Sequence, residues 1–348
     1  MTSPVISVLM PVHNGESFLS ESIESILNQT FDDFEFLIID DGSTDNTLEI
    51  IKSYTDPRIR LLSNKNNIGL VASLNSGIDA ARGRYIARMD ADDICRLDRL
   101  EKQIGFLDSR PEYGLVGSWF RLFGKDEGYV RPPLEYDDIQ IGLLFENVFG
   151  HPTVVFRKDI VEKHNIRYSE IYPYAQDYHF LYKVTNYCKA KNVDEILLYY
   201  RTHKSQISCR LNIIQHDIAK MIRKNILEET LGIGVSSRQE YLHDLLSCPR
   251  ICKDSELVET ISWSSLLIEE NKIVGKFDQN LLEHTVSLKF WELFRRNARI
   301  RGPSIWPLYF KYKYRKKTYR TRLQELVSFF LLFLASIKNS VALVAISL

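Results

Sequence analysis

Residues 5–47 read VISVLMPVHNGESFLSESIESILNQTFDDFEFLIIDDGSTDNT, and the spacing of their apolar residues changes twice. Residues 5–10 and 34–40 are continuous, β-rich apolar runs, a pattern typical of strands buried on both faces. Between them, apolar residues recur at helical spacing, at Leu19, Ile23, Ile26 and Leu27. The stretch therefore predicts a strand, a helix and a second strand, with a polar loop after each strand.

The same alternation continues through the next fifty residues. Ser43 or Thr44 can cap a second helix. Further strands are expected at 58–62 and 84–88, with a helix at 70–81 between them. Strands and helices that alternate in this way predict an α/β fold, with a mostly parallel sheet and helices on both faces. In such sheets the functional loops follow the carboxyl ends of the strands.

The regular alternation ends after the first third of the chain. Short strands are still predicted at 117–123, 153–157 and 196–200, and helical spacing dominates the residues that follow. We therefore divide the chain into an α/β domain over 1–210, with halves at 1–100 and 101–210, a helical extension over 211–295, and a C-terminal segment over 296–348.

The composition is that of a globular protein whose charges balance. Of 348 residues, 45% are hydrophobic, and 45 basic residues match 45 acidic ones, so no whole-molecule field favours a nucleic acid as partner. The five cysteines lack the spacing of a zinc site or a disulfide framework, which indicates a reducing compartment. Residues 1–15 have neither a basic start nor a long apolar run, so no signal peptide is expected.

Charge is unevenly distributed near the C-terminus. Residues 295–322 contain eleven Arg or Lys, no Asp or Glu, and several interleaved aromatic residues. Residues 326–348 form an apolar tail with Lys338 near its middle, where a charge costs roughly 2.5–3.5 kcal/mol in a bilayer. These features favour an interfacial or re-entrant membrane anchor over a full span, because cationic and aromatic residues suit anionic headgroups. The alternative is a buried pair of terminal helices with a solvated basic face.

An acidic loop, MDADD, follows the strand expected at 84–88. In extended backbone, residues i and i+2 project to the same side, so Asp90 and Asp92 can converge on one point. Two converging carboxylates suit Mg²⁺ or Mn²⁺. The alternative is a helix N-cap supplied by Asp92 or Asp93. We expect Asp93 to cap the next helix while Asp90 and Asp92 bind a metal.

The loops after the first two strands offer a site for a nucleobase. Asp40 and Asp41 end the second strand, where either can cap a helix or accept a hydrogen bond from the polar edge of a base. PVHN, residues 11–14, can form the opposite wall, with His13 against the base, as polar surface, or as a metal ligand. The sequence contains neither GxGxxG after a strand nor GxxxxGK[ST], which disfavours the common dinucleotide and P-loop sites.

Together these loops resemble the N-terminal half of the inverting family 2 glycosyltransferases of the GT-A fold, of the bacterial surface-polysaccharide type. The resemblance covers roughly residues 4–100, with PVHN, DDGSTDN and MDADD in the family's order. It implies a GT-A sheet with flanking helices, a nucleotide-binding half over 1–100 and an acceptor half over 101–210. It also implies a base and ribose pocket lined by Pro11, Val12, His13, Asn14 and Glu16.

The resemblance assigns further roles within this half. Asp41 would contact the base, and Arg88 would lie near the diphosphate. Asp90 and Asp92 would hold the sugar-nucleotide diphosphate through a divalent metal. The family commonly has tyrosine where this chain has His13, so base stacking is expected to differ there.

The second half contains weaker resemblances. YAQDYHFLYKV, residues 174–184, is similar to the family's segment that carries the general base, which implies that Asp177 removes the acceptor's proton. The family often has glutamate where this chain has Gln176, and Asp177 could instead cap the helix that follows. GHPTVVFRKD and YYRTHKSQIS also resemble segments that flank the family's site. They imply that His151 contacts the acceptor or the donor. They also imply that Arg201 and His203 close over the diphosphate, and that His203 is a further ligand of the metal. Plain surface charge is the alternative for these three residues.

The expected activity is transfer of a sugar from a nucleotide-diphospho-sugar, UDP-linked, to an acceptor hydroxyl with inversion and with Mg²⁺ or Mn²⁺. The C-terminal segment indicates a lipid-linked glycan as acceptor, with another oligosaccharide or a protein as the alternatives. It also indicates an enzyme that is peripheral or monotopic at the inner, cytoplasmic face of the membrane. The alternatives are a sugar nucleotidyltransferase, which usually has a Gly-rich phosphate loop after the first strand, and an inactive nucleotide-binding or scaffold protein at the membrane. A processive polysaccharide synthase is disfavoured because the sequence has no QxxRW segment.

Overall fold

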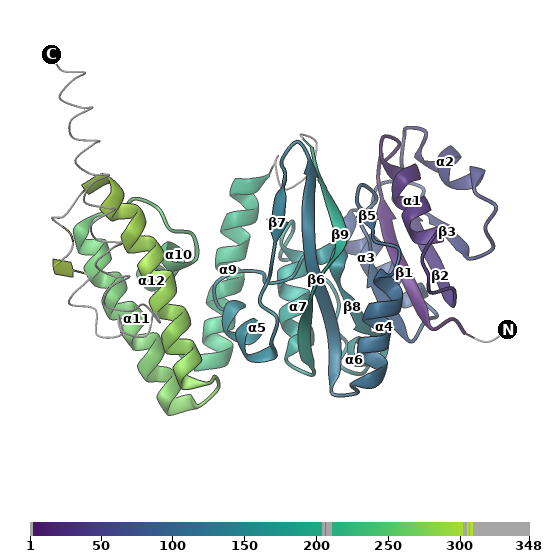
Figure 1. Cartoon of the computed structure of the whole chain (residues 1–348). Helices are drawn as coiled ribbons and strands as arrows, with labels where there is room; N and C mark the ends of the chain where they lie inside the picture. The colour runs from purple at the N-terminus through teal and green to yellow at the C-terminus, as the bar shows by residue number, and fades with distance from the viewer. Residues whose placement is uncertain (1–2, 204–205, 207–210, 302–304, 306, 309–348) are drawn as a thin grey trace, which may run out of the picture. The chain divides into compact units, whose positions relative to one another are not determined.

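The structure is a computed structural model that describes residues 3–203, 206, 211–301, 305 and 307–308 (Figure 1). Its contacts divide the chain into two units. The first comprises residues up to 139 together with 147–222, and the second comprises 140–146 together with the chain from 223 onward. The apolar tail over 326–348 and most of the basic segment before it lie outside the described residues.

A nine-stranded sheet forms the framework of the first unit. The strand order is β3-β2-β1-β4-β8-β6-β9-β5, with β7 beside β6. The strands are β1 (Ile6–Val12), β2 (Phe34–Asp40), β3 (Ile59–Ser63), β4 (Tyr85–Arg88), β5 (Ile94–Cys95), β6 (Tyr113–Gly124), β7 (Gly128–Val130), β8 (Val155–Arg157) and β9 (Lys189–Thr202).

The first four strands are parallel, as the alternation of strands and helices predicts. β8 then pairs antiparallel with both β4 and β6, and β9 runs parallel to β6. Two of the later strands are longer than expected, because β6 and β9 pair along almost their whole length. β8 is shorter, since residues 151–153 form a 3₁₀ turn before it.

Helices cover both faces of the parallel half (Figure 1). They are α1 (Leu19–Leu27), α2 (Thr47–Ser53), α3 (Leu70–Ala80) and α4 (Arg99–Ser109). Val8 of β1 belongs to one buried cluster with Ile23 of α1 and Leu100 of α4. Leu9 faces the other side, where a Cβ added to Gly77 of α3 would lie 2.2 Å from its Cδ1. The absent side chain therefore lets α3 pack closely on the sheet.

The remaining helices of the first unit follow the parallel half. They are the 3₁₀ turn η1 (His151–Thr153), α6 (Lys158–Lys163) and α7 (Gln176–Thr185). Two further helices, α5 (Tyr136–Gly142) and α9 (Asn212–Leu231), contribute residues to both units.

The second unit is helical in its described part. Its helices α10 (Ser237–Ser247), α11 (Asp254–Val274) and α12 (Gln279–Arg301) enclose an apolar core that contains Leu245, Leu267 and Phe290. A buried ion pair lies within this unit, where Arg223 Nη2 is 2.6 Å from Asp244 Oδ1. Within the described residues, no helix combines the length and apolarity that crossing a membrane requires.

Two expected helix caps are wrong. α2 begins at Thr47 after Asn46, so neither Ser43 nor Thr44 caps it. Ser43 Oγ instead accepts a hydrogen bond from the Asn14 backbone N–H at 3.0 Å. The Ser43 hydroxyl therefore contacts the loop after β1, and does not cap the helix as the local pattern suggested.

Asp93 does not cap α4 either, because that helix begins at Arg99 after Asp98. The chain stays extended after Asp93, since Ile94 and Cys95 form β5 and pair with β9. Asp93 is fully buried instead, and its Oδ1 accepts the backbone N–H of Arg201 at 2.8 Å. β5 pairs with β9, which is distant in sequence, so no local pattern predicts the pairing. Because of it, α4 begins only at Arg99.

Candidate active site at the carboxyl edge of the sheet

The loops after β1 and β2 are joined by hydrogen bonds at the carboxyl edge of the parallel strands. Asn14 Oδ1 accepts the backbone N–H of Thr44 at 2.8 Å. Glu16 Oε2 accepts both the backbone N–H and the side-chain amide of Asn46, at 3.0 and 2.8 Å. Asn14 has a φ of 53°, a left-handed conformation that asparagine tolerates better than most residues. The two loops therefore form one continuous wall, whereas the sequence suggested that PVHN would face the second loop as the opposite wall.

Pro11, Val12 and His13 lead from β1 into this wall. Pro11 and Val12 are buried in the strand, whereas His13 is exposed. His13 Nδ1 lies 3.0 Å from the backbone oxygen of Asp41. The structure therefore brings the residues expected to line the base pocket next to Asp41.

Asp41 is buried, and its carboxylate holds the loop that leads into α3. Oδ1 accepts Asn64 Nδ2 and the backbone N–H of Ile68, both at 2.9 Å. Oδ2 accepts the backbone N–H of Gly69, also at 2.9 Å. A carboxylate has about four acceptor positions, so three of those on Asp41 are already used within the chain. Sequence reasoning missed Asn64, because nothing in NKNNIG marks one asparagine over the others.

The three carboxylates of MDADD gather at the end of β4. One oxygen from each of Asp90, Asp92 and Asp93 lies within 4.8 Å of the others. Burial raises the pKa of Asp90, although the buried Arg88 guanidinium that contacts this carboxylate opposes the shift. Burial and the two neighbouring carboxylates raise the pKa of Asp93 well above its usual range. The cluster therefore offers several carboxylate oxygens close together, which are the ligands that Mg²⁺ and Mn²⁺ prefer.

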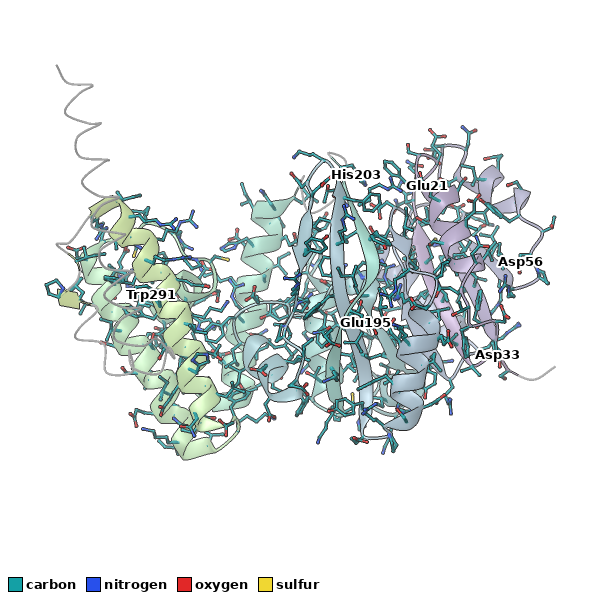
Figure 2. The ribbon with its side chains drawn as sticks, in the orientation of Figure 1. Glu21, Asp33, Asp56, Glu195, His203 and Trp291 are labelled. Carbon is teal, nitrogen blue, oxygen red and sulfur yellow. The ribbon has the colours of Figure 1, made fainter. Side chains whose placement is uncertain are left out.

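Arg201 and His203 come from the end of β9 and meet the acidic cluster. His203 Nε2 lies 2.9 Å from Asp92 Oδ2. Arg201 donates from Nε to the backbone oxygen of Asp92 at 2.8 Å. Figure 2 labels His203 together with Glu21, whose carboxylate lies 2.8 Å from Arg201 Nη2. The structure thus places both expected closing residues beside Asp92, and sequence reasoning missed Glu21.

Asp177 lies in the first turn of helix α7, which belongs to the second half of the first unit. The helix follows Ala175 at its N-cap, so Asp177 is not the capping residue. Asn147 Nδ2 donates to Asp177 Oδ2 at 2.8 Å. Burial raises the pKa of Asp177 to about 6, because the packed surroundings desolvate a side chain that is still partly accessible. The charge of Asp90 also raises this pKa, and that of Arg88 lowers it.

His151, the residue expected to contact acceptor or donor, begins the 3₁₀ turn η1. Its Nε2 lies 2.9 Å from the Tyr168 hydroxyl. Burial, helped by the positive charge of Arg88, holds the pKa of His151 well below its usual range, so the imidazole is neutral at physiological pH. Burial also raises the pKa of Tyr168. The pair therefore offers neutral hydrogen-bonding groups. Neither Tyr168 nor Asn147 carried a recognisable sequence signal.

Comparison with known proteins places this site in context. The family model for glycosyl transferase family 2 matches residues 7–172. An uncharacterised glycosyltransferase of Haemophilus influenzae is 34% identical over 313 residues, which cover 85% of this chain and 95% of that protein. The O-antigen biosynthesis glycosyltransferase WbnJ of Escherichia coli is 34% identical over 209 residues, covering 57% of this chain and 80% of WbnJ.

Solved structures show the same fold. Residues 1–349 of TarS from S. aureus, in complex with UDP-GlcNAc, align with a TM-score of 0.57 and 17% identity. The alignment covers 84% of this chain and 90% of the TarS chain. With the sheet topology, this likeness confirms the predicted GT-A architecture with helices after the sheet.

Proposed function

Because this chain belongs to glycosyltransferase family 2, we propose that it transfers a sugar from a nucleotide-diphospho-sugar to an acceptor hydroxyl with inversion and with a divalent metal. One observation carries the proposal. Three carboxylates gather at the end of β4, and the charge of one of them, Asp90, acts on the raised pKa of Asp177. The cluster suits a metal-bound diphosphate, and Asp177 suits a general base.

The wall of loops after β1 and β2 is proposed to hold the nucleoside. Pro11, Val12, His13, Asn14 and Glu16 would line it, and Asp41 would accept an N–H of the base. UDP is the first nucleotide to test, since TarS, which shares the fold, was solved with UDP-GlcNAc. Asp41 is already held by three donors, so its oxygens are in place before a base arrives.

Asp90 and Asp92 are proposed to hold Mg²⁺ or Mn²⁺, with His203 as a further ligand. The donor set fits, because carboxylate oxygens suit both ions and an imidazole nitrogen is compatible with Mn²⁺. When bound, such an ion would offset charge on the departing nucleoside diphosphate. Arg88 and Arg201 would add fixed positive charge beside the same oxygens.

Asp177 is proposed to remove the acceptor proton as the hydroxyl attacks the anomeric carbon. A pKa of about 6 leaves the group ionised at neutral pH yet more basic than an ordinary aspartate. The hydrogen bond from Asn147 fixes its orientation. Attack from the side opposite the leaving diphosphate inverts the anomeric configuration. His151 would contact the acceptor as a neutral imidazole.

The acceptor is proposed to be a lipid-linked glycan at the cytoplasmic face of the membrane. The sequence supports this through its C-terminal part, in which eleven basic residues over 295–322 precede the apolar run over 326–348. Cationic and aromatic residues beside an apolar segment favour an anionic membrane surface. The relative WbnJ is itself described as an enzyme of O-antigen biosynthesis.

Binding of a panel of nucleotide sugars, with and without Mn²⁺, tests the donor site. We expect metal-dependent binding that Asp92→Asn abolishes. Asp33→Asn is the matched control, because Asp33 is exposed just before β2, at the opposite edge of the sheet (Figure 2). Equal binding by Asp92→Asn, or no binding by the wild type, would contradict the assignment. Binding with no release of nucleoside diphosphate would favour a scaffold protein, and pyrophosphate release from a nucleoside triphosphate would favour a nucleotidyltransferase.

A further inference from the structure

Arg201 is enclosed by two aromatic rings that come from distant parts of the sequence. Its guanidinium carbon lies 4.5 Å from the ring centroid of Phe18, at the start of α1. It lies 4.6 Å from the ring centroid of Phe123, near the end of β6. Both distances are within the range of a cation–π contact, and the Arg201 side chain is only 13% exposed. The two rings therefore limit the positions that the guanidinium can take.

Hydrogen bonds hold the same guanidinium from two of its nitrogens. Nε donates to the backbone oxygen of Asp92, and Nη2 donates to Glu21 Oε2, both at 2.8 Å. The backbone N–H of Arg201 donates to Asp93. Within the described part of the chain, no hydrogen bond engages Nη1. Arg201 is therefore held through Nε and Nη2, and Nη1 remains as a donor for a ligand.

Phe18 also contacts the second closing residue. Its ring centroid lies 4.9 Å from that of His203, whose Nε2 is 2.9 Å from Asp92 Oδ2. One side chain at the start of α1 thus touches both residues that face the acidic cluster. Glu21, one turn further along α1, binds Arg201 from the same helix. Nothing in the motif YYRTHKSQIS points to either α1 residue.

The ion pair between Glu21 and Arg201 indicates how the contacts around Arg201 contribute. Glu21 offsets part of the positive charge of Arg201, so its presence does not add attraction for an anion. Its contribution is to position the guanidinium. A donor group held in place before the ligand arrives loses less entropy on binding and reorganises less during reaction. The contacts therefore favour positioning of Arg201 over added charge.

We propose that Phe18, Phe123 and Glu21 form a clamp that holds Arg201 with Nη1 directed at the second phosphate of the nucleotide donor. This proposal rests on the proposed function, in which Arg201 binds the diphosphate. Phe18, Phe123 and Glu21 are positioning residues, since they act through Arg201. The clamp makes the site selective for a nucleoside diphosphate over the corresponding monophosphate.

Titration of UDP and UMP into the full chain with Mn²⁺ tests the clamp, with GDP and GMP as a second pair. Phe18→Leu keeps an apolar side chain but removes the aromatic face. We expect it to weaken UDP binding roughly tenfold and to leave UMP binding unchanged. Phe18→Tyr, which keeps the face, should bind UDP as the wild type does. Glu21→Gln, which keeps an acceptor, should bind UDP at least as tightly as the wild type.

A double-mutant cycle separates the clamp from a general packing role. In an Arg201→Met background, Phe18→Leu should cause no further loss of UDP affinity. An equal loss in both backgrounds, an equal loss for UDP and UMP, or no loss at all would overturn the clamp. Phe123→Leu repeats the test from the opposite ring if thermal unfolding shows that Phe18→Leu does not fold.

The same titrations distinguish failure of the clamp from failure of the proposed function. If Arg201→Met weakens UDP binding and Phe18→Leu does not, the clamp is wrong and the donor site stands. If Arg201→Met binds UDP as tightly as the wild type, Arg201 does not contact the diphosphate and the clamp falls with that assignment. If neither UDP nor GDP binds the wild type at millimolar concentration, the donor site itself is wrong.

Discussion

Asp177 is the residue whose environment most directly links structure to chemistry. Burial raises its pKa to about 6, and the nearby charge of Asp90 adds to the shift while Arg88 opposes it. A carboxyl with a folded-state pKa above the unfolded value favours the folded state at low pH, and this stabilisation is lost as the pH rises from about 4 to about 6. At neutral pH the fold therefore keeps Asp177 ionised at a cost in stability, which is typical of a functional group.

The raised pKa predicts an acid limb in the rate. Asp177 must be ionised to accept a proton, so kcat for release of the nucleoside diphosphate should fall about tenfold per pH unit below about pH 6. Asp177→Asn should lower kcat by about 10²- to 10⁴-fold and leave nucleotide affinity unchanged. Steady-state rates between pH 4.5 and 8 measure both effects. A flat profile, or a variant as active as the wild type, would remove Asp177 as the base.

For single residues, the sequence predicts which acidic side chains belong to the candidate site better than it predicts the residues that donate hydrogen bonds to them. Motif order pointed to Asp41, Asp92 and Asp177, which follow β2, follow β4 and begin α7, respectively. Their hydrogen-bond partners Asn64 and Asn147 were missed, because both come from loops whose positions depend on tertiary folding. The roles of the acidic residues themselves remain predictions.

Loops are the elements in which the site is built, and Asp41 joins two of them. Its carboxylate accepts three hydrogen bonds from residues 64–69, which lead into α3. Asp41→Ala would leave the backbone N–H of Ile68 without an acceptor, and the backbone N–H of Gly69 with only Asn67 Oδ1 at 3.0 Å. We expect the free energy of unfolding to fall by about 2–4 kcal/mol, as measured by urea denaturation.

Asn64→Ala is the matched control for this element. It removes one donor and leaves both backbone contacts to Asp41, so a loss of about 1 kcal/mol is expected. If Asp41→Ala unfolds at the same urea concentration as the wild type, the carboxylate does not hold this loop. Nucleotide binding by the Asn64→Ala variant should persist, because the proposed base contact is retained.

The bounds of strands that are buried and apolar were predicted well. The bounds of strands that form because they pair with a distant strand were predicted less well. The apolar runs over 5–10 and 34–40 became β1 and β2 with almost the expected bounds. β9 begins at Lys189, in a polar segment that no apolar pattern marks, because it pairs with β6. The short β5 has the same origin, and it is the reason the Asp93 cap was wrong.

At the scale of the whole molecule, the α/β unit accounts for every residue of the proposed site. The described helices over 223–301 form a separate core with its own buried ion pair between Arg223 and Asp244. Composition and periodicity predicted both helical content and the change of architecture. They could not reveal that residues 140–146 join the second unit, since that depends on contacts far apart in sequence.

Removal of the C-terminal part tests whether the chain uses it to reach a membrane. A chain that ends at residue 322 keeps the eleven basic residues over 295–322 and loses the apolar run over 326–348. We expect the full chain to sediment with vesicles of anionic phospholipid and the shortened chain to remain largely in solution at 0.15 M salt, because charge attraction alone is screened there. Release of nucleoside diphosphate from the donor should be the same for both chains, since every proposed donor contact precedes residue 204. Co-sedimentation of the shortened chain to the same extent would show that the apolar run is not the anchor, and loss of donor turnover would show that it supports the fold instead.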